Sequence, residues 1–182
     1  MSLNLSDGQR AERKTFITVA EWTTGSGTSA VTHKEVLGRR VEDSSIEFNP
    51  DIATSTDILG ITYTDVNKTE PQQSFDTFYI MGGSDLAEYL VENALENKIS
   101  AYNNVFNIYL IMGFIPQTGT SGTTTISGYK AVKHTGCSII PQSIGGDSYT
   151  QMPIEAHFSN KITTGMVDKL DDTFQFIADQ TV

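Results

Sequence analysis

Residues 75–115 read FDTFYIMGGSDLAEYLVENALENKISAYNNVFNIYLIMGFI, and this stretch decides the fold. It contains one clear helix pattern, which predicts a helix over about residues 85–99, with Asp85 as N-cap and Glu88 three residues later. Apolar side chains recur at helical spacing and predict one buried stripe: Leu86, Leu90, Val91, Ala94, Leu95 and Ile99. The other face carries glutamates and is typical of a solvated surface. Strands on either side must cover the stripe.

The run that follows the helix, residues 105–115, is almost wholly apolar and rich in β-branched and aromatic residues, which favours a central strand. Working outward, alternating or apolar runs predict further strands at residues 15–22, 31–41, 44–49, 57–66, 75–81, 126–133, 137–144, 151–159, 161–167 and 172–179. We therefore expect a mainly β protein, an antiparallel sandwich or partly closed barrel with one flanking helix at about 85–99.

Proline, glycine and polar clusters predict the breaks between these strands. Pro50 is expected to end the strand at residues 44–49, and residues 66–71 and 116–122 are expected to be loops. His134, Thr135 and Gly136 form an apparent turn, so the two flanking strands are predicted to make a hairpin.

The length of 182 residues suits one domain, which we place at residues 15–182, after a flexible polar arm at residues 1–14. The arm lacks the apolar core of a secretory signal, and no apolar run is long enough for a spanning helix, so no membrane association is expected. A single cysteine, Cys137, excludes an internal disulfide and favours folding in a reducing cytosol.

The net charge of −10 is unevenly spread along the chain. Residues 1–40 carry a net charge of +2, residues 41–100 carry −10 and residues 101–182 carry −2. Nucleic-acid affinity rests on neutralising phosphates with Lys and Arg, so this acidic protein should repel DNA rather than hold it.

The chain contains a few of the residues that enzymes and metal sites use. His134 and Cys137 lack the second Cys or His pair of a structural zinc site, and a turn histidine and a buried thiol are the simpler interpretation. A nucleophile pairing of Cys137 with His134 or His157 lacks a glycine elbow and an oriented base. Gly25 and Gly27 are not followed by the Gly-Lys-Ser/Thr of a phosphate loop.

Carboxylates are abundant between Glu42 and Asp65, but abundance identifies no acid and base pair. We therefore assign no catalytic, cofactor-binding or metal-ligating residue and expect no enzyme.

The order and spacing of three stretches resembles the major tail tube proteins of tailed bacteriophages with long non-contractile tails. The first stretch joins residues 45–49 with 57–60, and the second joins residues 72–76 with 82–86. The third runs from Gly128 to Gly165 and contains residues 129–133, 137–139, 145–147, 152–155 and 164–165.

This resemblance implies a structural virion protein with a β-sandwich or barrel and a flanking helix. It implies self-assembly into rings, usually hexameric, that stack head to tail as a tail tube around a tape-measure protein. Tail terminator and distal tail proteins would be further partners. DNA would pass through the lumen without specific binding, and the protein, made in the bacterial host cytoplasm, would reside in the phage tail.

Three hypotheses about such a tube follow. Carboxylates from Glu42 to Asp65 would give the lumen a negative sign. The acidic middle of the chain would meet the basic first third in stacking: Arg10, Arg13, Lys14, Arg39 and Arg40. Residues 23–30 and the N-terminal arm would order only on stacking.

Two other interpretations stay open at this point, one of them within the same function class. A tube protein of contractile tails or type VI secretion shares the architecture, and a small β-sandwich that binds carbohydrate is the alternative outside the tube class. The tyrosines are too scattered to mark a sugar-binding face.

Overall fold

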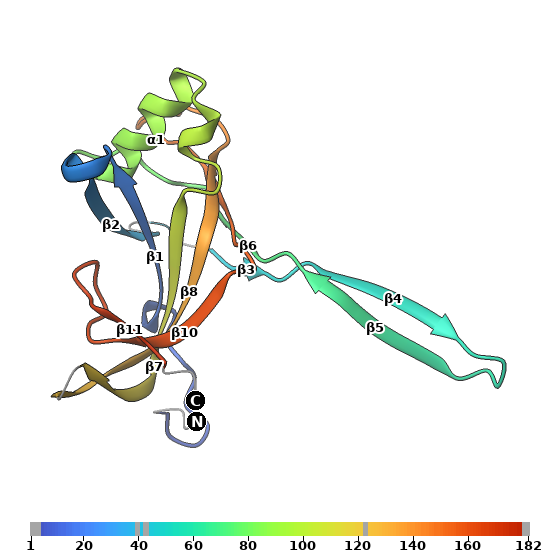
Figure 1. Ribbon diagram of the computed structural model, residues 1–182. Coiled ribbons are helices and arrows are strands. Elements are labelled where there is room, and N and C mark those ends of the chain that lie inside the picture. Colours follow the sequence, from blue (N-terminus) through green and yellow to red (C-terminus); the bar gives the residue numbers. More distant parts are fainter. Residues whose placement is uncertain (1–4, 39–40, 42–43, 122–123, 180–182) are drawn as a thin grey trace.

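The computed structural model describes residues 5–38, 41, 44–121 and 124–179. Figure 1 shows a body of strands with one helix at its end and a long two-stranded arm that projects sideways. The strands are β1 (Phe16–Thr24), β2 (Val31–Leu37), β3 (Ile46–Glu47), β4 (Pro50–Thr56), β5 (Thr62–Thr69), β6 (Gln72–Phe75), β7 (Phe106–Ser121), β8 (Thr124–Pro141), β9 (Ile154–His157), β10 (Ile162–Val167) and β11 (Phe176–Ala178). The helices are α1 (Asp85–Leu95) and three 3₁₀ turns, η1 (Arg13–Thr15), η2 (Gly27–Ser29) and η3 (Ile99–Ala101).

The main sheet is an open antiparallel sheet in the order β2-β1-β7-β8-β9-β6-β3, to which β10 and β11 are added beside β8. Among the described residues it leaves free edges, so it does not close into a barrel, and α1 is the single α-helix. The predicted mainly β, antiparallel fold with one flanking helix is therefore confirmed. The separation of an arm at residues 1–14 from a single domain at 15–182 stays a prediction.

Strand β1 has apolar cover on both faces, as its sequence predicts. Ala20 and Trp22 belong to one buried cluster with Phe106 and Leu90. Val19 belongs to a second cluster on the opposite face, which residues from β8, β10 and the C-terminal segment complete: Ala131, Val167 and Phe174. The sheet is thus the middle layer between two cores.

The predicted turn at residues 134–136 is wrong, because β8 runs unbroken from Thr124 to Pro141. Its partner β7 pairs Asn107 with Thr135 and Phe106 with Cys137, so Gly136 is the extra residue of a bulge and adopts a φ of +77°. On one side of this bulge β8 pairs with β10, and on the other side with β9. The bulge redirects one long strand between two parts of the sheet.

The predicted loop at residues 116–122 is also wrong over its described part, because β7 continues to Ser121. Pro116 lies where the register with β8 shifts, a position where a residue without an N–H group is tolerated.

Helix α1 begins and ends differently from its sequence prediction. Its N-cap is Ser84, whose hydroxyl accepts from the Ala87 N–H, rather than Asp85. It ends at Leu95, because Asn97 takes a φ of +54° and Ile99 starts η3. Leu95 and Ile99 are consequently 73% and 55% exposed, and the buried face consists of Leu86, Ala87, Leu90 and Asn93.

Buried Glu35 of β2 holds the start of this helix. Its carboxylate accepts from the Ser84 hydroxyl at 2.6 Å and from the Leu86 N–H at 3.0 Å. A carboxylate at a helix N-terminus is favoured by the helix dipole, so β2 fixes where α1 sits.

The remaining strands follow the sequence to different degrees. The alternation at residues 151–159 is confirmed, since its inward residues are all buried: Met152, Ile154, Ala156 and Phe158. The strands predicted at 161–167 and 172–179 appear as β10 and β11. The strand predicted at 75–81 lies earlier, at Gln72–Phe75, because a turn follows Phe75 and only Tyr79 makes an isolated bridge, with Gln151. Of the strand predicted at 44–49, only Ile46–Glu47 forms.

Candidate functional site

The arm formed by β4 and β5 is the most unusual feature of the molecule. Within the described ranges the two strands pair only with each other, and every residue of both is exposed (Figure 1). The sequence predicted one strand at 57–66, whereas the chain reverses there: the Asp57 carboxylate accepts from the N–H groups of Leu59 and Ile61, both at 2.9 Å. The expectation that Pro50 ends a strand is wrong as well, because Pro50 begins β4, where no donor is required.

The register of the arm separates an uncharged face from a mixed one. Ile52 faces Val66 across the ribbon, Thr54 faces Thr64, and Thr56 faces Thr62. These six side chains share one face because alternate residues of a strand point the same way. The opposite face includes the Ala53–Asp65 and Ser55–Tyr63 pairs. Neither face packs on the body.

Half of the large apolar side chains that are exposed in the described residues lie on this arm or at its base. The tip is the extreme case, with Ile58 102% exposed and Leu59 78% exposed. The others are Phe48, Ile52, Ile61, Tyr63 and Val66. Contiguous exposed apolar surface of this kind marks interaction sites.

An isolated two-stranded ribbon is marginally stable in water at best, and its free edges offer unpaired N–H and C=O groups. This arm has no core of its own and two free edges. It therefore gains most from pairing with a further surface, which makes it the candidate interaction site.

The carboxylates expected to line a lumen lie mainly on this arm or beside it. Asp51, Asp57 and Asp65 belong to its strands and tip, while Glu42 lies outside the described residues. At the base, Lys68 and Glu70 pair at 2.6 Å, which raises the pKa of Lys68 and lowers that of Glu70. The arm thus carries a net negative charge.

The histidines and the cysteine considered for chemistry lie on β8 and β9. Cys137 is buried, and its thiol donates a hydrogen bond to the His134 carbonyl oxygen at 3.5 Å. Burial raises the pKa of this thiol. His134 Nδ1 lies 2.9 Å from the Ser159 carbonyl oxygen. His157 pairs across the sheet with Ser138, so its side chain lies on the face opposite Cys137. Within the described residues no group of three His, Cys, Asp or Glu could hold a metal.

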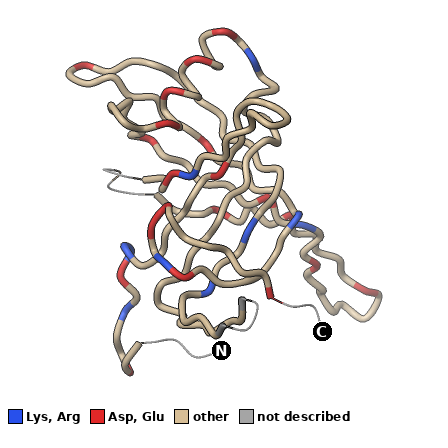
Figure 2. Tube along the Cα trace, turned by 60° about the vertical axis from the view of Figure 1, so that its left-hand side comes forward, with Lys and Arg blue, Asp and Glu red and all other residues tan. Residues whose placement is uncertain are grey.

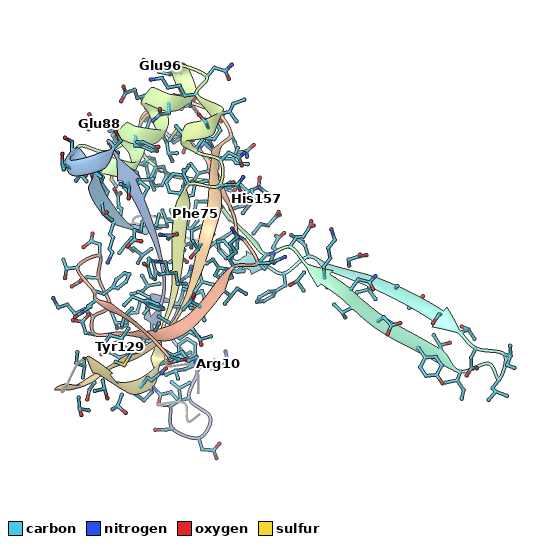
Figure 3. All side chains as sticks on the ribbon, viewed as in Figure 1. Arg10, Phe75, Glu88, Glu96, Tyr129 and His157 are labelled. Atoms are coloured by element: carbon cyan, nitrogen blue, oxygen red, sulfur yellow. The ribbon has the colours of Figure 1, made fainter. Side chains whose placement is uncertain are left out.

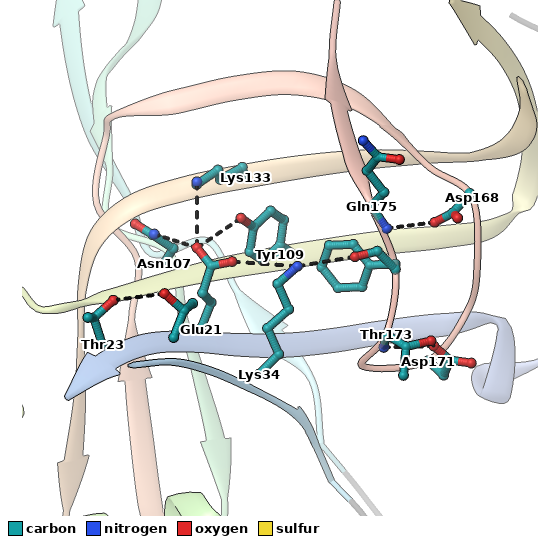
Figure 4. Close-up of polar contacts among 12 residues, drawn as sticks. Glu21, Thr23, Lys34, Asn107, Tyr109, Lys133, Asp168, Asp171, Thr173 and Gln175 are labelled. Atoms are coloured by element: carbon teal, nitrogen blue, oxygen red, sulfur yellow. Dashed lines mark hydrogen bonds and ion pairs between the residues drawn. The ribbon is translucent and has the colours of Figure 1, made fainter. Parts of the chain in front are cut away.

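Sequence reasoning missed the polar cluster centred on Glu21 (Figure 4). The Glu21 carboxylate accepts from Asn107 Nδ2 at 2.8 Å and from the Tyr109 hydroxyl at 3.1 Å. It also lies 3.6 Å from Lys34 Nζ and 3.7 Å from Lys133 Nζ. Burial, followed by the charge of Glu21 and its hydrogen bond, raises the pKa of Tyr109 well above its ordinary value.

Lys34 extends this cluster to the C-terminal segment. Its ammonium group donates to the Phe174 carbonyl at 3.1 Å and lies 4.3 Å from the centre of the Phe174 ring. The Phe174 ring meets Tyr109 edge-on at 4.9 Å. The cluster thus ties four strands and the C-terminal segment together, which is a structural role.

No model of a known protein family matches the chain, and no curated protein sequence matches it. Among solved structures, the chain is similar to one from an extracellular contractile injection system, the PVC sheath–tube complex in its extended state. The TM-score is 0.41 and the identity 13%, over 87% of this chain and 93% of that chain. A likeness at this level does not establish a shared fold or function. Separately, the described residues contain no helix that is long and apolar enough to cross a bilayer.

Proposed function

We propose that this chain is a structural subunit that assembles with copies of itself into a tube of the phage-tail type, and that it is not an enzyme. The observation that carries the proposal is the projecting β4–β5 arm, which has exposed apolar residues along it and no partner strand among the described residues of its own chain. A subunit with such an arm is incomplete alone and is completed by a neighbour.

The arm supports self-assembly in general. The order and spacing of the three sequence stretches, which resemble tail tube proteins, support a tail tube in particular. In such a tube the copies form rings, whose number of copies imaging would give, and the rings stack around a tape-measure protein. The acidic arm fits a lumen or contact surface that does not hold DNA, since phosphates are repelled by carboxylates. The proposal covers tubes of contractile and of non-contractile tails.

A matched pair of substitutions tests the role of the arm. Ile52 on the arm and Ile162 on the body are both 55% exposed, so Ile52→Ser and Ile162→Ser remove equal apolar surface. We expect Ile52→Ser to raise the concentration needed for assembly, measured by sedimentation velocity, by about tenfold, as the loss of one buried Ile side chain would give. Ile162→Ser should change it much less. Equal effects of the two variants, or a wild-type protein that stays monomeric, would contradict the proposal.

A further inference from the structure

A groove beside α1 is open in the part of the chain that the structure describes. Two hollows of about 470 and 340 Å³ share Ile80 and Met81 as lining residues. Val91 of α1 and Tyr149 complete the apolar lining, and Tyr149 is 77% exposed. The combined space is sufficient for aliphatic side chains of a partner.

The rim of this groove is acidic. Glu88 and Glu92, exposed residues of α1, line the larger hollow. Figure 2 shows mostly acidic positions at the α1 end of the body, at the top of the view. Near this end Lys98 forms an ion pair with Glu96, and the carboxylates of Glu96 and, to a smaller extent, Glu92 raise the pKa of Lys98, so a single lysine lies among several carboxylates. The groove therefore suits an apolar side chain that is accompanied by a positive charge.

The opposite end of the body carries an apolar residue, Leu5, and a cation, Arg10, with exposed Asp7 between them in the chain. A turn in which the Gln9 N–H donates to the Ser6 carbonyl at 2.9 Å places Leu5 and Arg10 on either side of it. The Arg13 guanidinium donates hydrogen bonds to the carbonyls of Phe16 and Ser44 in its own chain, and Lys14 forms an ion pair with Glu12. Figure 3 labels Arg10 at the lower end of the body, far from Glu88 and Glu96 at the upper end.

We propose that the groove beside α1 receives the N-terminal segment of a second copy, with Leu5 entering the apolar hollow and Arg10 facing Glu88 and Glu92. The inference rests on the proposed self-assembly and names its axial contact. Two different, complementary patches at opposite ends of one body make a heterologous contact that does not close, so copies add without limit along one axis.

Cysteine cross-linking tests this contact directly. The natural Cys137 is buried, so introduced cysteines react selectively. In Leu5→Cys/Met81→Cys, a short bis-maleimide should give a ladder of covalent dimers, trimers and longer species on a denaturing gel. The control is Leu5→Cys/Ile99→Cys, since Ile99 is exposed at the same end but does not line the groove. A ladder of equal length in both variants, or none in the first, overturns the inference.

A charge exchange gives an independent readout. Arg10→Glu and Glu92→Lys should each raise the assembly concentration about tenfold or more, and the two together should restore it, as close charge pairs at interfaces do. Glu96→Lys, directly after the last residue of the same helix and outside the groove, should not be compensated by Arg10→Glu. Visible rings or tubes without cross-linking would overturn this contact and leave the proposed function standing. A wild-type protein that never associates would contradict both this contact and the proposed function.

Discussion

The Glu21 carboxylate makes polar contacts with four side chains from three other strands, and its substitution should be costly. Glu21→Ala removes the partner of two half-buried lysines and leaves the Asn107 and Tyr109 donors unpaired. We expect the free energy of unfolding in urea to fall by about 2 kcal/mol. Exposed Glu88→Ala is the control and should stay within about 0.5 kcal/mol of the parent. Equal values for the two variants would show that the cluster does not stabilise the fold.

Tyr109 should make stability sensitive to alkaline pH. Its pKa is raised in the folded protein, so the native state keeps the proton while the unfolded state loses it above about pH 10. The stabilisation is therefore complete below that pH and declines as the pH rises through it, by up to about 1.4 kcal/mol per pH unit. Tyr109→Phe should flatten this decline in unfolding measurements between pH 9 and 11, and exposed Tyr149→Phe should not. A decline of the same slope in all three proteins would contradict the assignment.

Contacts of this kind could not be read from the sequence. The burial of Cys137 was predictable from its residue type, and it is 1% exposed. Glu21 and its partners are different, because Lys34, Asn107 and Lys133 come from three other strands. Their meeting depends on the register between strands, which residue types alone do not encode.

The start of helix α1 offers a test at the level of one element. Ser84 caps the helix, whereas Asp85, the residue that the sequence pattern favoured, is exposed. Ser84→Ala should cost about 1 kcal/mol in the free energy of unfolding, the usual loss for an N-cap. Asp85→Ala should cost clearly less, and thermal or urea unfolding of the two variants decides between the caps. A larger loss for Asp85→Ala would restore the sequence-based assignment.

The bulge in β8 offers a second such test. A Cβ at Gly136 would meet only the Asn104 carbonyl oxygen, at 3.7 Å, so space is available. The φ of +77° is the obstacle, and Gly136→Ala should cost about 1–2 kcal/mol in unfolding free energy. Gly136→Asn should cost less, because Asn tolerates this conformation better. An Ala variant as stable as the parent would mean that β8 passes this point without the left-handed residue.

Elements with a strong periodic pattern were predictable, and those set by distant pairing were not. The alternation at residues 151–159 and the apolar run at 105–115 define strands by themselves. Gly136 looks like a turn residue locally, and only the pairing of β8 with three other strands makes it a bulge. The arm has threonines and exposed isoleucines in place of a buried stripe, so no pattern marked β4.

The molecule as a whole consists of a body with two cores and an arm that contributes to neither. The stability of the monomer should therefore be insensitive to the tip of the arm. Ile58→Ser/Leu59→Ser should leave the free energy of unfolding of the monomer within about 0.5 kcal/mol, as exposed positions do. The same variant should assemble poorly, and a variant that unfolds easily would instead place the tip inside the folding unit.

The central claim is that copies of this chain build a tube, and electron microscopy tests it most directly. Purified protein at high concentration would be imaged by negative stain, with its solution mass measured on the same sample. We predict rings or hollow tubes, which would also give the number of copies per ring and show whether the acidic arm faces the lumen side. Compact monomers at every concentration, with the arm intact and with preformed assemblies added as initiators, would contradict the account.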